Sequence, residues 1–135
     1  MSQSTVVVNT ANFESEVVQS DVPVVIDLWR PGCPPCVAMA PHLEDLAAKY
    51  QGKLKVVKVN VWEDPSIAQA FEVQSVPTLA VVYKGTLMGK EVGFGGKPWL
   101  EALFNEVLTV PQRYEEHLAS EKAGEGDKDR PPTDA

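Results

Sequence analysis

Two cysteines, the only two of the chain, flank two prolines in the segment Cys33-Pro34-Pro35-Cys36. Such a pair can open and close a disulfide, hold half of a metal site, or act as a structural staple. Because Pro34 disfavours helical backbone for the residue before it, and Pro35 fits a first helical turn, Cys33 is predicted to lie at a helix N-terminus. Unpaired N–H groups and the helix dipole favour a thiolate there. We therefore predict that the more exposed Cys33 attacks a disulfide and the shielded Cys36 resolves the intermediate.

The staple and the metal site are the weaker alternatives. Closing a four-residue ring stabilises a fold by roughly 2 kcal/mol in the chain-entropy model, against about 4.7 kcal/mol for a 100-residue loop. A zinc site needs four ligands, and the chain adds only His42 and His117 as soft partners. His117 lies in the charged C-terminal region, far along the chain from the cysteines. The residue types therefore favour a redox pair.

Two charged residues interrupt predicted strands and could serve that chemistry. Asp27 lies within an apolar run, where burial would raise the pKa of its carboxyl toward neutrality. Such a carboxyl can take up and return the proton of a nearby thiol, directly or through water. A solvent-facing Asp at a strand end is the alternative. Lys58 breaks the apolar face of the next strand and could pair with Asp27, although a solvated lysine is the simpler interpretation.

Hydrophobic periodicity places these residues on alternating strands and helices. The nearly continuous apolar run at 22–29 is typical of a central strand buried on both faces. Parallel crossovers followed by a hairpin predict an α/β fold, a mixed sheet covered by helices. Asn12 can cap the first of these helices, and Asp64 is expected as the cap of a short helix through Phe71, with Pro65 at its first position. The expected strands are 5–8, 22–29, 54–61, 78–83 and 87–92, and the expected helices begin near residues 12, 35, 64 and 97.

The composition predicts one soluble domain at 1–110 and a C-terminal extension at 111–135. With 135 residues, 44% of them hydrophobic, the chain can bury a core without covalent help. A net charge of -7 argues against nucleic acid, which calls for a basic patch. We see no membrane-spanning run and no signal peptide, and expect a cytoplasmic monomer. The extension could be helical at 112–119, and its last fifteen or so residues are expected to be a charged, disordered tail because 120–135 lack Leu, Ile, Val and aromatic residues.

Several separated motifs also match a known family in order and spacing. The chain resembles a thioredoxin over about residues 5–109 through Asp27, Trp29, Cys33-x-Pro35-Cys36, Pro41, Lys58, Pro65, Val76-Pro77-Thr78, Gly85 and Gly93. The resemblance implies the thioredoxin fold, with a central five-stranded mixed sheet flanked by four helices. It implies reduction of protein disulfides without a bound cofactor, through a redox-active disulfide between the two cysteines. The dithiol would be restored by an NADPH-dependent thioredoxin reductase.

The resemblance also assigns residues to roles. Cys33 would be the nucleophile, Cys36 the resolving thiol, and Asp27 the buried acid and base with Lys58 beside it. A cis peptide bond before Pro77 would lie opposite the cysteines, and the backbone of the preceding residue would pair with an extended substrate segment. The substrate-binding residues that we predict are Trp29, Gly32, Pro34, Pro35, Trp62, Val76, Pro77, Gly93 and Phe94.

Departures from the family pattern leave other functions open. Pro34 stands where a glycine is usual and stiffens the loop, while Gly32 and Val37 remove an aromatic residue and a cation. Trp62 replaces a frequent acid and Phe94 a small residue, which together suggest an apolar contact surface with altered partner choice. The alternatives to a reductase are a disulfide oxidase or isomerase on the same fold, and a binding or co-chaperone module in which the thiols are incidental.

Overall fold

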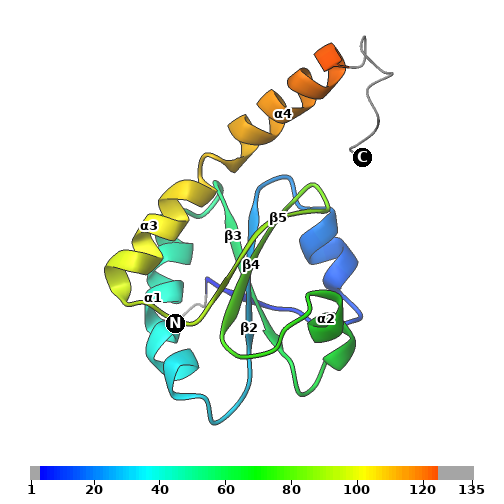
Figure 1. The fold of residues 1–135 in the computed structure, drawn as a ribbon. Helices are drawn as coiled ribbons and strands as arrows, with labels where there is room; N and C mark the ends of the chain where they lie inside the picture. Colours follow the sequence, from blue (N-terminus) through cyan, green and yellow to red (C-terminus); the bar gives the residue numbers. More distant parts are fainter. Residues whose placement is uncertain (1–3, 125–135) are drawn as a thin grey trace.

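Five strands form one mixed sheet in the order β1-β3-β2-β4-β5 in the computed structural model, which describes residues 4–124 (Figure 1). β1, β3 and β2 run parallel, whereas β4 and β5 form an antiparallel hairpin beside β2. The mixed α/β sheet expected from the sequence is confirmed. The strands are β1 (Val6–Val7), β2 (Val24–Trp29), β3 (Lys55–Asn60), β4 (Thr78–Tyr83) and β5 (Thr86–Val92).

Helices cover both faces of this sheet. Side chains of α1 and α3 pack on one face, and those of η1 and α2 pack on the other. η1 is a short π-helix, and α4 follows α3 and projects beyond the sheet (Figure 1). The helices are η1 (Glu14–Val18), α1 (Pro34–Lys49), α2 (Pro65–Ala70), α3 (Lys97–Val107) and α4 (Val110–Gly124).

The central strand β2 explains why its sequence is apolar nearly throughout. Because side chains alternate along a strand, Val25 faces the core under α1 and α3, whereas Ile26 and Leu28 face the core under η1 and α2. Asp27 has the same parity as Val25 and therefore points toward α1. The one carboxyl of the strand is thus placed on the side of the sheet that carries the cysteine helix.

The cap expected at Asn12 is wrong, because Phe13 is the N-cap residue of η1, whereas Asp64 lies at the N-cap of α2 with Pro65 after it, as expected. The Asn12 side-chain oxygen accepts the Asn9 backbone N–H at 2.7 Å, and the Asn9 side-chain oxygen accepts the Asn12 backbone N–H at 3.1 Å, so this pair stabilises the turn before η1. Asp64 makes no side-chain cap on α2. Its Oδ1 instead accepts the N–H and the hydroxyl of Thr10, both at 3.1 Å. The side-chain oxygens of Asn12 and Asp64 therefore both accept hydrogen bonds from residues that lie earlier in the chain, outside the helix that follows.

α4 is longer than the 112–119 segment expected from the sequence. Near its start, the ring of Tyr114 packs edge-on against Tyr83 with centroids 5.1 Å apart. Lys84 Nζ lies 3.8 Å from a carboxylate oxygen of Glu115. The hairpin turn after β4 therefore holds the first turns of α4. The remainder of the predicted tail, residues 125–135, lies outside the described residues. Within residues 4–124, none of the helices has the length and apolar character that crossing a bilayer requires.

Candidate active site

Cys33 and Cys36 form a disulfide at the N-terminus of α1. Cys33 is the N-cap residue, with extended backbone at φ -109° and ψ 104°, and Pro34 and Pro35 begin the helix. The Sγ atom of Cys33 accepts the backbone N–H of Cys36 at 3.2 Å. The position predicted for Cys33 from the two prolines is confirmed. After reduction, a thiolate on this sulfur would receive the same N–H and the positive end of the helix dipole.

The difference in exposure expected between the two cysteines is wrong. Cys33 is 2% exposed and Cys36 is 5% exposed, so both sulfurs are buried in the disulfide state. The reason is the N-cap geometry, which directs the Cys33 sulfur back over the helix end, toward the Cys36 N–H. What distinguishes the two sulfurs is therefore their position relative to the helix N-terminus.

Asp27 is buried in the sheet with an unsatisfied carboxyl oxygen. The residue is 1% exposed, and among the described residues its Oδ1 has no hydrogen-bond partner. Burial raises the pKa of this carboxyl to about 7, and the positive charge of Lys58 acts in the opposite direction. The register of β2 on β3 pairs the two residues directly. The pKa expected from the sequence argument, near neutrality, agrees with this environment.

Lys58 contacts the aromatic ring beside the disulfide loop rather than the carboxylate. Its Nζ lies 5.4 Å from the centroid of the Trp29 ring, a cation–π distance. In the described part of the chain it forms no ion pair with Asp27 within 4 Å. Lys58 is half-buried, so its charge still reaches the carboxyl through a partly apolar environment.

A pocket of about 180 Å³ joins the buried carboxyl to one of the two cysteines. This volume exceeds what a single water molecule requires. Cys36 lines the pocket, whereas Cys33 does not. The lining residues are Asp27, Trp29, Cys36, Val37, Ala40 and Lys58. The arrangement connects Asp27 with Cys36.

The segment before β4 lies at the same end of the sheet as the disulfide. The peptide bond between Val76 and Pro77 is cis, as the resemblance implied. Thr78, the next residue, pairs with Leu28 near the end of β2, which places the proline beside the strand that leads to the cysteines. The Gly93 N–H donates to the Pro77 carbonyl at 2.8 Å. Two of the separated substrate-binding candidates are thereby in direct contact.

The two aromatic candidates, Phe94 and Trp62, have different neighbours. Phe94 is half-buried between His42 and Trp99, with ring centroids 5.9 and 6.3 Å away. Trp62 is 65% exposed and contacts the guanidinium of Arg30, whose Cζ lies 5.6 Å from its ring centroid. Among the described residues no ring contact joins the two aromatic side chains.

Arg30 is the residue near this site that the sequence argument missed. It follows β2 immediately, at the strand end that leads into the disulfide loop. A charged side chain directly after a buried strand was the available signal. Gly32 also gains a structural reason, because its φ of +75° lies in the left-handed region that favours glycine.

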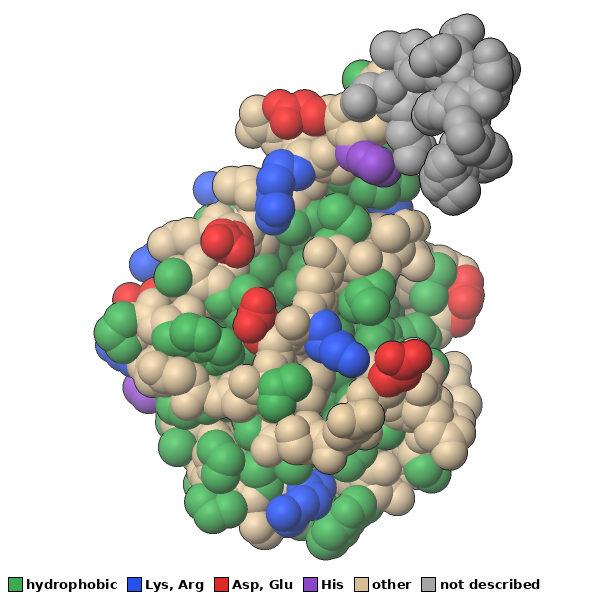
Figure 2. All heavy atoms as spheres, in the orientation of Figure 1, with side chains coloured by type: hydrophobic (Ala, Val, Ile, Leu, Met, Phe, Trp, Pro, Cys, Tyr) green, Lys and Arg blue, Asp and Glu red, His purple; other side chains and the backbone are tan. Residues whose placement is uncertain are grey.

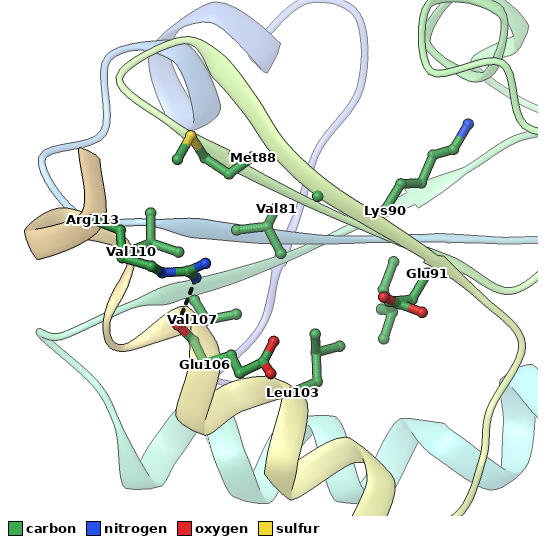
Figure 3. Close-up of a pocket in the computed structure, with 11 residues that line it drawn as sticks. Val81, Met88, Lys90, Glu91, Leu103, Glu106, Val107, Val110 and Arg113 are labelled. Carbon is green, nitrogen blue, oxygen red and sulfur yellow. Dashed lines mark hydrogen bonds between the residues drawn. The ribbon is translucent and has the colours of Figure 1, made fainter. Parts of the chain in front are cut away.

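A further pocket lies away from these residues, between β4 and β5, α3 and the start of α4 (Figure 3). It has a volume of about 170 Å³ and an apolar floor that includes Val81 and Leu103. The Arg113 guanidinium at its edge donates to the Glu106 carbonyl at 3.2 Å. None of the predicted site residues lines it. Across residues 4–124, His, Cys, Asp and Glu side chains form no group of three that could hold a metal ion.

Comparison with known proteins agrees with this geometry. The family model for thioredoxin matches residues 4–106. The chain belongs to the thioredoxin family. A thioredoxin of Haemophilus influenzae is 40% identical over 99 residues, covering 73% of this chain and 92% of the relative. Thioredoxin 1 of a Nostoc species is 39% identical over 111 residues, with 82% and 94% covered, and a thioredoxin of Pseudomonas aeruginosa is 38% identical over 105 residues, with 78% and 97% covered.

Family membership and the cysteine pair together establish the activity. The thioredoxin relatives span several bacteria, and this chain carries the Cys33–Cys36 disulfide at the start of α1. It is therefore a thiol–disulfide oxidoreductase that reduces protein disulfides. Thioredoxins carry out this exchange with their cysteine pair and need no bound cofactor. The predicted fold, activity and redox-active disulfide are confirmed.

Proposed function

We propose that this thioredoxin reduces cytoplasmic protein disulfides with Cys33 as the nucleophile, Cys36 as the resolving thiol and Asp27 as the group that takes the Cys36 proton. The observation that carries the assignment is the division between the two cysteines. The Cys33 sulfur lies at the N–H groups of the helix N-terminus, and Cys36 shares a pocket with Asp27. The Cys33 sulfur would therefore be the stable thiolate, and the Cys36 thiol would lose its proton to Asp27 when the mixed disulfide is resolved.

The reaction begins with the dithiol form. The Cys33 thiolate attacks one sulfur of the substrate disulfide, forming a mixed disulfide and releasing the other substrate sulfur as a thiolate. The Cys36 N–H and the helix dipole stabilise the attacking thiolate. The released thiolate takes a proton from solvent.

The second step returns the protein to the state of the structure. Asp27 accepts the proton of the Cys36 thiol, directly or through water in their shared pocket. The Cys36 thiolate then attacks Cys33 Sγ, which forms the intramolecular disulfide and releases the second substrate thiolate. Two electrons pass from the dithiol to the substrate, and Asp27 can return its proton to the departing sulfur. A pKa of about 7 suits both directions of transfer near neutral pH.

The substrate segment would bind at the end of the sheet where the cis bond lies. The backbone before Pro77 is available for strand-like pairing with an extended segment, and Gly93 adjoins it without a side chain. On the disulfide side, Trp29, Gly32 and the two prolines of the active-site loop would form the opposite wall. Gly32 and both prolines are exposed, which supports a contact role.

An NADPH-dependent thioredoxin reductase would restore the dithiol after each turnover. Electrons must come from outside, because the described residues contain no other cysteine. We place the cycle in the cytoplasm, where reducing systems keep such thiol pairs reduced. Pro34 and Gly32, which depart from the family pattern, lie on the exposed loop and would set how well a given reductase fits.

Trapping the mixed disulfide tests the division of roles. The Cys36→Ser variant, reduced and mixed with insulin, should accumulate a covalent adduct on Cys33 that intact-mass spectrometry detects. The matched Cys33→Ser variant should form none at pH 7. An adduct that forms as fast on Cys36 of the second variant would reverse the assignment.

The reduction potential separates the reductase from the oxidase or isomerase alternative. An equilibrium titration of the Cys33–Cys36 pair against glutathione should give a value near that of thioredoxins, about -270 mV. A value near -120 mV, typical of a strongly oxidising thiol pair, would contradict the reductase assignment. Pro34→Gly is the informative comparison, because it restores the residue usual in the family.

A further inference from the structure

Arg30 presents a positive charge beside the disulfide loop. Its Nη1 donates to the Pro31 carbonyl at 2.9 Å, and a Cβ added to Gly32 would lie 3.7 Å from the same nitrogen. The guanidinium is therefore near the residue that precedes Cys33. Among residues 4–124 the ion pairs within 4 Å are Lys55–Glu16 and Lys84–Glu115, so Arg30 meets no carboxylate of the described chain.

The ring of Trp62 holds this guanidinium in place. Trp62 lies in the turn after β3, where the Asn60 side-chain oxygen accepts its backbone N–H at 2.9 Å. The same oxygen accepts the Glu63 N–H at 3.4 Å, which fixes the turn from both residues. The Arg30 guanidinium lies over the exposed ring at a cation–π distance. A guanidinium stacked on a ring keeps N–H groups along its edge free to bind a carboxylate that lies in the guanidinium plane.

A pocket at this end of the sheet is lined by residues from Arg30 to Val76, next to the cis bond. It has a volume of about 430 Å³. Val61 and Val73 give it aliphatic walls, whereas Arg30, Gln74 and Ser75 supply polar groups and Val76 closes it on the side of Pro77. In Figure 2 hydrophobic side chains, with basic atoms among them, lie at the end of the molecule opposite α4. The pocket thus combines apolar walls with one cation.

We propose that this pocket selects protein disulfides in which a glutamate or aspartate lies within two residues of the reacting cysteine. A substrate segment that pairs with the backbone of Val76 while its cysteine reaches Cys33 must pass this pocket. The methylene groups of a glutamate would pack on the two valines, and its carboxylate would accept paired hydrogen bonds from Arg30. This substrate preference rests on the proposed function of the disulfide.

The preference is local rather than a property of the whole molecule. With a net charge of -7, the chain repels acidic proteins at a distance. An acidic side chain gains only once it reaches the guanidinium, so the effect should appear for residues next to the cysteine and not for distant acids. Glu63 is adjacent to Trp62 but forms no ion pair with Arg30 within 4 Å, so its carboxylate does not bind the guanidinium N–H groups.

A set of peptide disulfides tests the proposal. Each probe is an otherwise uncharged peptide, disulfide-linked to a fluorescent thiol, with Glu, Gln or Lys at one of the two positions on either side of its cysteine. At one of these positions kcat/KM should be about tenfold higher for Glu than for Lys, a difference of about 1.4 kcal/mol. The Gln probe, which has the shape without the charge, should fall between them. The preference should shrink in 1 M NaCl.

Variants assign the preference to Arg30. Because the readout is a ratio of two substrates on one variant, a general loss of activity cancels. Arg30→Gln should bring the Glu-to-Lys ratio close to one, and Arg30→Glu should invert it. Lys53→Glu is the control for Arg30→Glu. It makes the same charge change at the opposite end of the sheet, before β3 begins, and should keep the wild-type Glu-to-Lys ratio. Trp62→Leu removes the ring under the guanidinium and should reduce the ratio.

The outcomes separate this proposal from the activity on which it rests. Reduction of the neutral hydroxyethyl disulfide by the wild-type protein, without discrimination between Glu and Lys at any position, would overturn the acidic preference alone. A preference that survives in Arg30→Glu would also overturn it. Failure of the wild-type protein to reduce any probe, the neutral disulfide included, would contradict the proposed function and the preference together.

Discussion

Replacing Asp27 with asparagine removes a titratable group from the sheet while nearly preserving the size of the side chain. In the folded protein burial raises the pKa of this carboxyl from 3.8 to about 7. The folded state therefore holds the proton more tightly than the unfolded chain does. Between these two pKa values the native protein binds more protons, so stability falls as pH rises. This direction is the reverse of that produced by a salt-bridged aspartate.

The size of the effect follows from the shift. About three pKa units, at about 1.4 kcal/mol each, make the charged Asp27 cost about 4 kcal/mol above pH 8. At pH 5 the cost is only about 1.5 kcal/mol, because the folded-state carboxyl is then almost fully protonated. The free energy of unfolding of Asp27→Asn, relative to wild type, should therefore increase by about 2.5 kcal/mol between pH 5 and pH 9.

Guanidinium unfolding of the oxidised proteins, followed by far-ultraviolet circular dichroism at pH 5, 7 and 9, measures this difference. Comparing variant with wild type cancels the other titrating groups, and the disulfide state removes thiol titration. Asp45→Asn, at an exposed position on α1, reports the effect of removing one negative charge from the surface. A stability difference for Asp27→Asn that stays the same at pH 5 and pH 9 would refute the assignment of burial as the dominant influence on this carboxyl.

Substitutions at three further positions, with one comparison variant, test other parts of the structure by the same unfolding measurement. Gly32→Ala should lower stability by about 1 kcal/mol because of its left-handed backbone, whereas Gly89→Ala has space for the added methyl group and should cost less. Partial burial tends to raise the pKa of Glu44, but hydrogen bonds led by that from the Thr5 hydroxyl hold it below its usual value. Loss of these hydrogen bonds in Glu44→Gln should cost about 1 kcal/mol at pH 7, and the loss should diminish as pH falls below 4.5, the ordinary pKa of a glutamate carboxyl. Phe104 is 0% exposed, so Phe104→Ala should cost about 3–5 kcal/mol, and an undiminished stability would contradict its place in the core.

Features written in a short stretch of sequence could be predicted. The apolar run of β2 follows from burial on both faces, and the position of Cys33 at the start of α1 follows from the two prolines after it. Asp27 was identified for the same reason, since a carboxyl within such a run must be buried if the strand is central. In each case the determining interaction is with the residue's own strand or helix.

Features that depend on distant partners could not be predicted. Asp64 occupies the predicted N-cap position of α2, but its side-chain oxygen accepts hydrogen bonds from Thr10, which lies 54 positions earlier in the chain, and none from the helix. The stacking of Arg30 on Trp62 likewise requires β2 and β3 to be paired before the two side chains meet. Such choices are made by tertiary structure rather than by local sequence.

The position of α4 determines whether the disulfide stays accessible when the protein is immobilised or fused through its C-terminal end. α4 begins beyond α3 and projects from the end of the molecule opposite the loop between β2 and α1 (Figure 1). Its 15 residues span about 22 Å along the helix axis. A bead or fused domain joined after this helix would be held away from the disulfide, which would face outward. Immobilisation through the C-terminus should therefore leave insulin reduction at its solution rate, and a large loss of rate would show that the helix does not stand clear.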